Sequence, residues 1–163
     1  MKVLFVCLGN IARSTMAEAL FTQMVADDGL SAQIKIDSAG TSDVEQGNPP
    51  HPGTQKILRK LNVPFDWIYA RQIQADDFKT ADYIITMDRQ NLATLKRRCP
   101  KQWQDKVHLA YEILPEKYDQ EIPDPWYTQR FDITYQQLIE VLPMWLQLFK
   151  NELAYYPEKS DEE

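Results

Sequence analysis

Residues 3–26, VLFVCLGNIARSTMAEALFTQMVA, join a short apolar run to a helical pattern through a polar loop. The run at Lys2–Cys7 is continuously apolar after Lys2 rather than alternating, which is typical of a strand buried on both faces. From residue 13 to residue 26, apolar side chains recur at the spacing of one helix face. A buried strand followed at once by a helix favours an open parallel sheet.

The alternation of strand and helix patterns continues along the chain. Further strands are predicted at 33–37, where Ser38-Ala39-Gly40 ends the strand, and at 82–87 and 107–110. Further helices are predicted at 54–61, 90–98 and 131–153. Residues 111–130 have a composition typical of loops and are predicted to form one. The pattern predicts one α/β domain at 1–156, with helices on both faces of the sheet, and a polar, acidic tail at 157–163.

Composition narrows the class of protein. The chain has 163 residues and a net charge of −6, which argues against a nucleic-acid-binding face. Its compact basic cluster, residues 96–98, is expected at the C-terminus of a helix. No apolar stretch is long enough for membrane insertion, and the run at 3–6 is too short for a secretion signal. With only two cysteines, the chain is expected in the reducing cytoplasm, where Cys7 stays a thiol.

The segment from Cys7 to Ser14 has the layout of a phosphate-binding loop with a nucleophile at its base. In parallel sheets, ligands bind beyond the carboxyl ends of the strands, where this loop begins. Gly9 is expected to allow the tight turn. Arg13 offers a planar fork that can grip two phosphate oxygens, and Ser14 can donate its hydroxyl to the sulfur.

The size of each possible contribution to the reaction rate indicates which of these groups matters most for catalysis. A free thiol is only about 3% ionised at pH 7, so full ionisation of a nucleophilic sulfur gains at most roughly thirtyfold in rate. Hydrolysis of a phosphate monoester needs far more than that. Orientation, and donors matched to the transition state, must supply the rest. We therefore expect Arg13 and the loop amides to contribute more than thiol activation.

The leaving oxygen also needs a proton. Asp124 lies in the Pro-stiffened segment Ile122-Pro123-Asp124-Pro125-Trp126-Tyr127 and is predicted to fold back over the crevice as a general acid. Trp126 and Tyr127 would form an apolar wall for an aryl group. His51 and His108 have no partners at metal-ligand spacing, so both are interpreted as structural and no metal is expected.

Several further segments carry a family resemblance. They are Val6-Cys7-Leu8-Gly9-Asn10-Ile11, Arg13-Ser14, Met16-Ala17-Glu18-Ala19, Asp37-Ser38-Ala39-Gly40-Thr41, Ala70-Arg71-Gln72-Ile73, Asp77-Phe78, Asp82-Tyr83-Ile84-Ile85, Met87-Asp88, Asn91-Leu92 and Asp124-Pro125. With these motifs in this order, the chain resembles the low-molecular-weight protein tyrosine phosphatases over roughly residues 3–150. The resemblance implies a flavodoxin-like, four-stranded parallel sheet of strand order 2-1-3-4, without metal or other cofactor.

The resemblance also implies roles for individual residues. Cys7 would form a phosphocysteine, Arg13 would clamp the phosphate, and Asp124 would act as the acid and later as the base for water. Asn10, Ser14 and Ser38 would brace the loop by hydrogen bonds. The implied substrate-binding positions belong to the loop and the cleft wall, and are Leu8, Gly9, Asn10, Ile11, Ala12, Ser14, Val44, Trp126 and Tyr127.

The chain departs from the family pattern at three of these positions. Ala12 stands where many members have a second cysteine, which could capture an oxidised Cys7 as a disulfide. Val44 stands where the cleft is often aromatic, and Trp126 where Tyr or Phe is common. The departures concern redox protection and substrate preference, not the chemistry at Cys7.

Two alternatives to the phosphatase hypothesis stay open at this point. A thiol-dependent arsenate reductase shares the loop, but it needs further cysteines and only Cys99 is available. A non-catalytic phosphopeptide-binding module would keep the cradle without turnover. The expected partner is a phosphotyrosine protein or peptide, with bacterial tyrosine kinases among the possibilities, and the expected state is a monomer or weak dimer.

Overall fold

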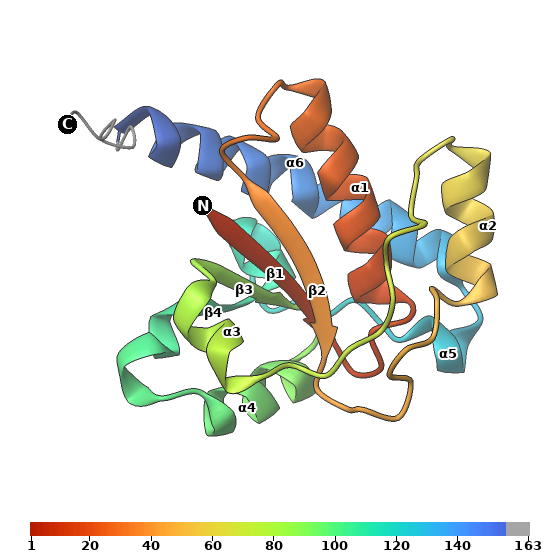
Figure 1. The fold of residues 1–163 in the computed structure, drawn as a ribbon, viewed down its shortest axis with the longest axis horizontal. Coiled ribbons are helices and arrows are strands. Elements are labelled where there is room, and N and C mark those ends of the chain that lie inside the picture. Colours follow the sequence, from red (N-terminus) through yellow and green to blue (C-terminus); the bar gives the residue numbers. More distant parts are fainter. Residues whose placement is uncertain (156–163) are drawn as a thin grey trace.

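A four-stranded parallel sheet in the order β2-β1-β3-β4 forms the centre of the computed structural model, which describes residues 1–155 (Figure 1). The strands are β1 (Lys2–Cys7), β2 (Lys35–Gly40), β3 (Tyr83–Thr86) and β4 (Val107–Leu109). The register pairs Cys7 of β1 with Gly40 of β2. The carboxyl ends of the strands therefore meet at one edge of the sheet, as the sequence predicts.

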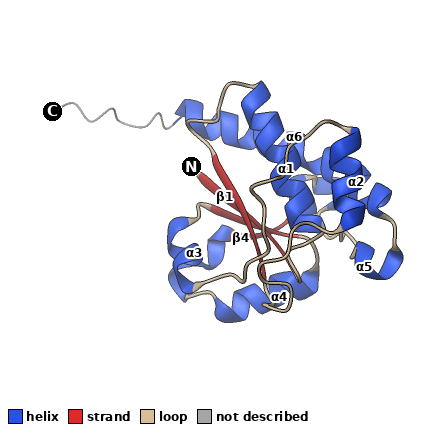
Figure 2. Ribbon diagram, turned by 45° about the vertical axis from the view of Figure 1, so that its right-hand side comes forward, coloured by secondary structure: helices blue, strands red, loops and turns tan. Residues whose placement is uncertain are grey.

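Helices cover both faces of this sheet, as Figure 2 shows. The helices are α1 (Arg13–Asp27), α2 (Pro52–Lys60), α3 (Ala75–Thr80), α4 (Arg89–Arg98), α5 (Pro125–Thr128) and α6 (Phe131–Tyr155). Short 3₁₀-helices lie at η1 (Lys101–Lys106), η2 (Ala110–Ile113) and η3 (Pro115–Lys117). In Figures 1 and 2, α1, α2 and α6 lie on one side of the sheet and α3 and α4 on the other.

The alternation of side chains along β1 explains why both faces are covered. Val3 and Phe5 pack into a cluster with residues of α1 and α6, whereas Leu4 and Val6 pack with residues of α3 and α4. All four side chains are completely buried. Because successive residues of a strand point to opposite faces, a strand between two helix layers must be apolar throughout.

The secondary-structure prediction needs three corrections. The second strand does not end before Ser38-Ala39-Gly40, because these residues are in β2 and pair in register with β1 up to Cys7. Residues 111–130 are not only loop, since they contain most of η2, all of η3 and the short helix α5. Helix α3 was not predicted, because six residues are too few to show a helical period. The predicted tail at 157–163, and residue 156 at the predicted domain end, lie outside the described residues.

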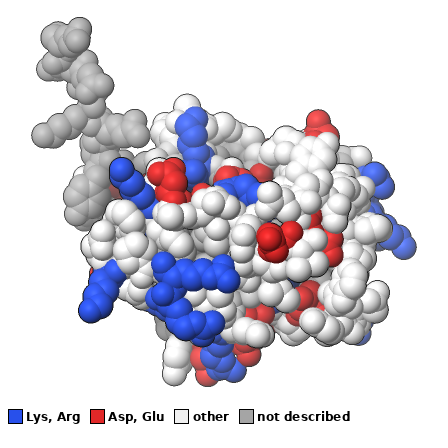
Figure 3. Space-filling view, turned by 60° about the horizontal axis from the view of Figure 1, so that its bottom comes forward, with Lys and Arg blue, Asp and Glu red and all other residues white. Residues whose placement is uncertain are grey.

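The charged side chains are unevenly distributed. On the face shown in Figure 3, most Lys and Arg side chains gather toward the left, whereas Asp and Glu are scattered over the face. The basic cluster at 96–98 lies in the last turn of α4, as predicted. There Arg98 donates to the carbonyl of Thr41 at 2.7 Å, which ties the helix end to the loop after β2. Within residues 1–155, no helix is both long and apolar enough to cross a bilayer.

Candidate active site

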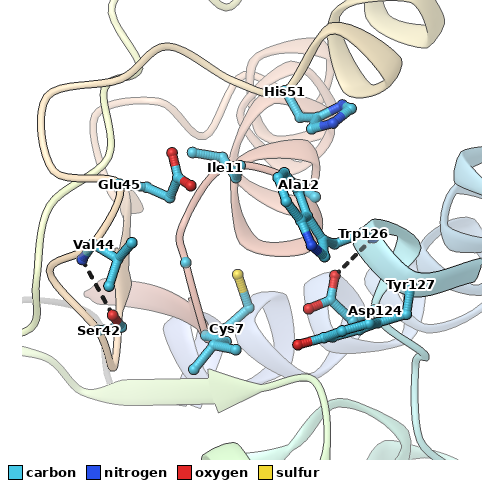
Figure 4. Close-up of a pocket in the computed structure, with 12 residues that line it drawn as sticks. Cys7, Ile11, Ala12, Ser42, Val44, Glu45, His51, Asp124, Trp126 and Tyr127 are labelled. Atoms are coloured by element: carbon cyan, nitrogen blue, oxygen red, sulfur yellow. Dashed lines mark hydrogen bonds between the residues drawn. The ribbon is translucent and has the colours of Figure 1, made fainter. Parts of the chain in front are cut away.

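A pocket opens at the carboxyl edge of the sheet, directly above the end of β1. Figure 4 shows the sulfur of Cys7 and the carboxylate of Asp124 directed into this pocket. The residues that line it come from the loop after β1, the loop after β2 and the start of α5, and are Cys7, Leu8, Gly9, Ile11, Ala12, Ser42, Val44, Glu45, His51, Asp124, Trp126 and Tyr127. Cys7 is only 3% exposed, so its sulfur lies at the base of the pocket and not on the open surface.

Hydrogen bonds from outside fix the orientation of the loop. The carbonyl groups of Cys7, Leu8 and Ile11 accept bonds from the amides of Thr41, Ser42 and His51, respectively. All described peptide bonds are trans, so each N–H points opposite to the preceding carbonyl. The amides that follow these carbonyls therefore point away from the outer loops. This orientation and the start of α1 at Arg13 suit the binding of an anion.

Asn10 is the residue of the loop that takes the left-handed conformation. Its φ is 57°, in the left-handed region, whereas Gly9 is not among the residues with positive φ. The expectation that Gly9 makes the turn possible is therefore wrong. Asn tolerates this conformation better than most residues, because its side chain can form compensating hydrogen bonds. Here Asn10 is completely buried and its Oδ1 accepts from the backbone amide of Arg71 at 3.0 Å.

The amide of Asn10 links two hydroxyl groups behind the loop. Its Nδ2 donates to Ser14 Oγ at 2.7 Å and to Ser38 Oγ at 2.9 Å. Ser14 Oγ lies 3.0 Å from the sulfur of Cys7. Since Ser14 Oγ accepts from Asn10, its own proton is available to the sulfur. Asn10, Ser14 and Ser38 thus form one hydrogen-bonded chain that ends at Cys7.

Arg13 is held almost completely buried beside the pocket. Its Nη1 donates to Asp88 Oδ2 at 2.6 Å and to the carbonyl of Ile122 at 2.9 Å, and its Nη2 lies 3.5 Å from Asp124 Oδ2. Burial by itself lowers the pKa of Arg13, but the negative charges of Cys7, Asp88 and Asp124 outweigh it, so the pKa is raised. The guanidinium therefore stays charged between the thiol and the carboxylate.

Asp124 caps the short helix α5. Its Oδ1 accepts from the amide of Trp126 at 3.0 Å, and Pro125 occupies the first helical position. This leaves Oδ2 on the side of Arg13. Trp126 and Tyr127 follow in α5 and are 54% and 77% exposed, so the two rings form the outer wall of the pocket.

Four residues at or beside the site were missed by sequence reasoning. Ser42, Glu45 and His51 line the pocket, and Asp88 holds Arg13. Asp88 follows β3 directly, so its position at the carboxyl edge of the sheet is a signal that could have been used. His51 was interpreted as structural; it caps α2 by accepting from the amide of Gly53 and also stacks on Phe131 and contacts Trp126 edge-on.

The structure separates the predicted site residues into two groups. Most of them line the pocket, namely Cys7, Leu8, Gly9, Ile11, Ala12, Val44, Asp124, Trp126 and Tyr127. Asn10, Arg13, Ser14 and Ser38 do not line it; they are buried behind or beside it. Among residues 1–155, no group of three or more His, Cys, Asp or Glu side chains could hold a metal ion.

Comparison with known proteins identifies this arrangement. The model of the low molecular weight phosphotyrosine protein phosphatase family matches residues 2–155. The chain belongs to this family. The low molecular weight protein-tyrosine-phosphatase YfkJ of Bacillus subtilis is 43% identical over 131 residues, which are 80% of this chain and 84% of YfkJ. The low molecular weight phosphotyrosine protein phosphatase of Mus musculus is 42% identical over 150 residues, which are 90% of this chain and 94% of the relative.

Solved structures share the fold. The crystal structure of YfkJ superposes with a TM-score of 0.90 at 39% identity, covering 93% of this chain and 96% of that one. The structure of DARP, a Drosophila arginine phosphatase, superposes with a TM-score of 0.84 at 32% identity, covering 99% of this chain and 100% of DARP. The family and the strand order 2-1-3-4 implied by the sequence motifs are thus confirmed.

Cys99 does not line the pocket and packs in a different apolar cluster from Cys7. It belongs to the apolar cluster on the α4 side of the sheet, whereas Cys7 belongs to the cluster on the α1 side. Burial raises the pKa of the Cys99 thiol, and its sulfur contacts the carbonyl of Pro100. An arsenate reductase mechanism, which needs further reactive thiols, is not favoured by this placement.

Proposed function

We propose that this phosphatase hydrolyses phosphotyrosine and small aryl phosphates through a phosphocysteine formed on Cys7. The observation that carries the proposal is that Cys7 and Asp124 line one pocket and that buried Arg13 lies beside it, with its guanidinium Nη2 3.5 Å from the Asp124 carboxylate. A nucleophile, a phosphate clamp and an acid are the groups that a two-step displacement at phosphorus requires.

In the first step, the Cys7 thiolate attacks phosphorus and the bond from phosphorus to the phenolic oxygen breaks. Asp124 donates its proton to the departing oxygen, so tyrosine leaves as a neutral phenol. Arg13 binds two equatorial oxygens of the phosphoryl group, together with backbone amides of the loop at Leu8–Ala12. The product of this step is a phosphocysteine and an ionised Asp124.

In the second step, water attacks the phosphocysteine. Asp124 accepts a proton from the water, the bond from sulfur to phosphorus breaks, and phosphate leaves. Cys7 returns as a thiolate, which the hydroxyl of Ser14 at 3.0 Å stabilises by donating to it. The same carboxylate is therefore acid in the first step and base in the second.

The pocket wall favours an aryl phosphate. Ile11, Val44, Trp126 and Tyr127 present apolar surface around the mouth of the pocket, against which a phenyl ring can pack. A phosphoarginine, the type of substrate named for DARP, would bring a charged or polar guanidino group against the same surface. Glu45 also lines the pocket, and Asn48 already donates to its Oε2 at 2.7 Å. We therefore expect faster turnover of phosphotyrosine than of phosphoarginine.

Turnover by four variants tests the proposal. Cys7→Ser should lose at least about 10⁴-fold in kcat with a phosphotyrosine peptide, and Asp124→Ala about 10²–10⁴-fold. The loss in Asp124→Ala should be smaller with p-nitrophenyl phosphate, whose leaving group needs the proton less. Cys99→Ser and the exposed Asp119→Ala serve as matched controls and should keep wild-type rates.

The pH and metal dependence complete this test. The rate should peak in mildly acidic solution, because the acid must be protonated while the thiol is ionised. EDTA treatment should leave the rate unchanged. Undiminished turnover by Cys7→Ser, or a rate that depends on added metal, would contradict the proposal.

We further propose that the protein works in the reducing cytoplasm as a monomer or weak dimer, on a phosphotyrosine protein such as a bacterial tyrosine kinase. The support is chemical: turnover requires a reduced Cys7, and the pocket accepts an aryl phosphate. Capture of phosphoproteins by Asp124→Ala from cell extract, with Cys7→Ser/Asp124→Ala as control, identifies the partner. Sedimentation equilibrium determines the oligomeric state.

A further inference from the structure

His51 lines the pocket, but the proposed chemistry does not use it. Its side chain is half-buried, and Figure 4 shows the ring well apart from the sulfur of Cys7, above the indole of Trp126. His51 therefore faces the part of a substrate that lies beyond the phosphoryl group. Any effect of His51 on turnover should depend on what the substrate carries there.

One hydrogen bond decides which ring nitrogen of His51 carries a proton. The Nδ1 accepts from the backbone amide of Gly53 at 3.0 Å, which caps α2. A backbone amide can only donate, so Nδ1 has no proton of its own and the proton of the neutral ring is on Nε2. Among residues 1–155, no group accepts this proton. His51 thus offers a hydrogen-bond donor at the pocket that the folded chain leaves unused.

Three contacts fix the position of this donor. The ring stacks on Phe131 at 4.7 Å between centroids and meets the ring of Trp126 edge-on at 5.9 Å. The backbone amide of His51 donates to the carbonyl of Ile11 at 2.7 Å, which attaches the residue to the loop of the site. By contrast, Tyr127, whose hydroxyl is another donor at the pocket, is 77% exposed. A donor that is held in place before the substrate arrives loses little entropy on binding.

The charges of the pocket select the kind of acceptor that suits this donor. Glu45 and Asp124 line the pocket, and none of the described residues that line it is Lys or Arg. An acidic side chain beside the phosphotyrosine would therefore meet like charges. A main-chain carbonyl is neutral, accepts a hydrogen bond and lies next to every phosphotyrosine of a protein. The donor of His51 is thus better matched to the main chain of a peptide than to an acidic side chain.

We propose that His51 is a specificity-determining residue, which donates from Nε2 to a main-chain carbonyl of a phosphotyrosine-containing peptide. This bond has no counterpart in a small aryl phosphate. The inference rests on the proposed function, because it requires that the phosphoryl group of phosphotyrosine binds at Cys7. It narrows the preferred substrate from aryl phosphates in general to phosphotyrosine within a polypeptide chain.

Two substrates with closely similar leaving groups isolate the contribution of the main chain. One is p-cresyl phosphate, which reproduces the side chain of phosphotyrosine, and the other is a phosphotyrosine peptide flanked only by alanines. The readout is the ratio of kcat/KM for the peptide to kcat/KM for p-cresyl phosphate. A change in the chemistry at Cys7, Arg13 or Asp124 affects both substrates about equally and cancels in this ratio.

Three substitutions separate the donor, the cap and the ring of His51. His51→Asn keeps an acceptor for the amide of Gly53 but is too short to place a donor where Nε2 lies. His51→Gln extends an amide N–H to about the position of Nε2 but gives up the cap. His51→Phe keeps the ring without the donor or the cap. The matched control is His108→Asn, at a histidine that stacks on Tyr83 and does not line the pocket.

We expect the ratio to fall about 3–10-fold in His51→Asn and His51→Phe, which is the loss of one hydrogen bond between neutral groups. The ratio should stay within about twofold of wild type in His51→Gln and His108→Asn. Among the variants of His51, the thermal transition should fall furthest in His51→Gln, which loses both the cap and the ring contacts. Specificity and stability should thus change in different variants.

An unchanged ratio in His51→Asn would overturn the inference. Equal losses in His51→Asn and His51→Gln with a retained ratio in His51→Phe would also overturn it, because the ring contacts alone would then matter. A loss that appears only when glutamates flank the phosphotyrosine would assign the acceptor to an acidic side chain, against the proposal. If His51→Asn does not fold, the comparison of His51→Phe with His51→Gln decides.

Failure of the wild type to hydrolyse either substrate would instead contradict the proposed function. The inference is then tested without turnover, by isothermal titration calorimetry with a phosphonate analogue of the alanine-flanked peptide and with benzylphosphonate. The ratio of the two dissociation constants should change about 3–10-fold, against the peptide, in His51→Asn and stay unchanged in His108→Asn. Equal ratios in wild type and His51→Asn would overturn the inference.

Discussion

At the scale of single residues, the position of the Arg13 side chain is fixed by contacts at both terminal nitrogens. Its fork donates to Asp88 and Ile122 on one nitrogen and faces Asp124 with the other. An ammonium group has three donors, but all of them are on one nitrogen, so it lacks the planar, two-nitrogen fork that makes these contacts on separate sides. The side chain is thus held before any phosphate arrives, and little ordering is left for substrate binding.

Arg13→Lys tests this geometry. We expect kcat/KM for phosphotyrosine to fall about 10²–10³-fold, because a point charge cannot bind two phosphoryl oxygens in one plane. The measurement is steady-state turnover together with the inhibition constant of inorganic phosphate, which should weaken in the same variant. A matched control is Arg97→Lys, at an exposed position in the last turn of α4. Equal losses in both variants would contradict the argument.

Among the elements, the segment before α3 links the loop of the site to the sheet edge. Arg71 accepts from the amide of Gly40 through its carbonyl and donates its own amide to Asn10. Its side chain is fixed by Asp77, which accepts from both terminal nitrogens at 2.8 and 2.9 Å. Asp77 also accepts from the amide of Gln74, which completes the capping box of α3. One carboxylate thus holds the helix start and the Arg71 side chain together.

The stability of Asp77→Asn should depend on pH. Burial alone would raise the pKa of Asp77, but the bonds from Arg71 and from the amide of Gln74 outweigh it and hold the pKa below its usual value. A lowered pKa gives stability that is present above the unfolded value of about 3.9 and is lost as the pH falls through the folded value. We expect the variant to lose about 2 kcal/mol of unfolding free energy at pH 7.

Urea denaturation between pH 7 and pH 3 measures this difference. The gap between wild type and Asp77→Asn should be widest near neutral pH. It should begin to narrow below about pH 4, because Asp77 of the unfolded chain takes up a proton there while the folded carboxyl, with its lowered pKa, does so only at lower pH. A gap that stays constant over this range would show that the charge of Asp77 contributes nothing to stability.

At Gly53 of helix α2, the higher helix propensity of alanine is opposed by a steric clash with a neighbouring side chain. Alanine is the better helix former by about 1 kcal/mol, but a Cβ at Gly53 would lie 2.5 Å from ring atoms of Phe131. His51 also stacks on this ring at 4.7 Å between centroids, so Phe131 has little room to move. We expect Gly53→Ala to lose about 1–3 kcal/mol of unfolding free energy, measured by urea denaturation. Recovery in Gly53→Ala/Phe131→Leu would confirm the clash as the cause; a more stable single variant would contradict it.

At the scale of the whole molecule, most residues that form the apolar core and the residues that form the site occupy different parts of the sheet. The two apolar clusters fill the layers on either face, and the site occupies the edge where the strands end. Trp145 on α6 is 2% exposed, and its Nε1 donates to the carbonyl of Ala110 at 2.9 Å. It is a core residue that does not line the pocket.

Trp145→Phe should therefore lower stability without lowering activity. The substitution leaves a small cavity and a buried carbonyl without its donor, which we expect to cost about 1–3 kcal/mol of unfolding free energy. At 25 °C, well below the unfolding transition, kcat and KM should stay within about twofold of wild type. Thermal denaturation and steady-state kinetics on the same sample check both halves. A large change in KM would contradict the separation.

Much of the site could be predicted because its parts are close in sequence. Cys7, the loop and Arg13 are joined by one strand-loop-helix unit, and the constraints of that unit are local. Asp124 required family motifs in addition, because an Asp-Pro pair by itself is ordinary turn chemistry. Asp88 could have been found from its place directly after a predicted strand. His51 and Glu18 could not be assigned from local sequence, since their partners come from other elements.

The amino-acid sequence by itself determined the α/β class, the phosphate-binding loop and the family, because hydrophobic period and short motifs depend on residues near one another in the chain. Only the tertiary structure decided that Asn10 rather than Gly9 takes the left-handed turn, that Asp88 and Asp124 flank Arg13, and that Glu18 lies behind the loop with Trp67. The physical reason is that burial and hydrogen-bond direction are set by groups that meet only when the sheet brings distant segments together.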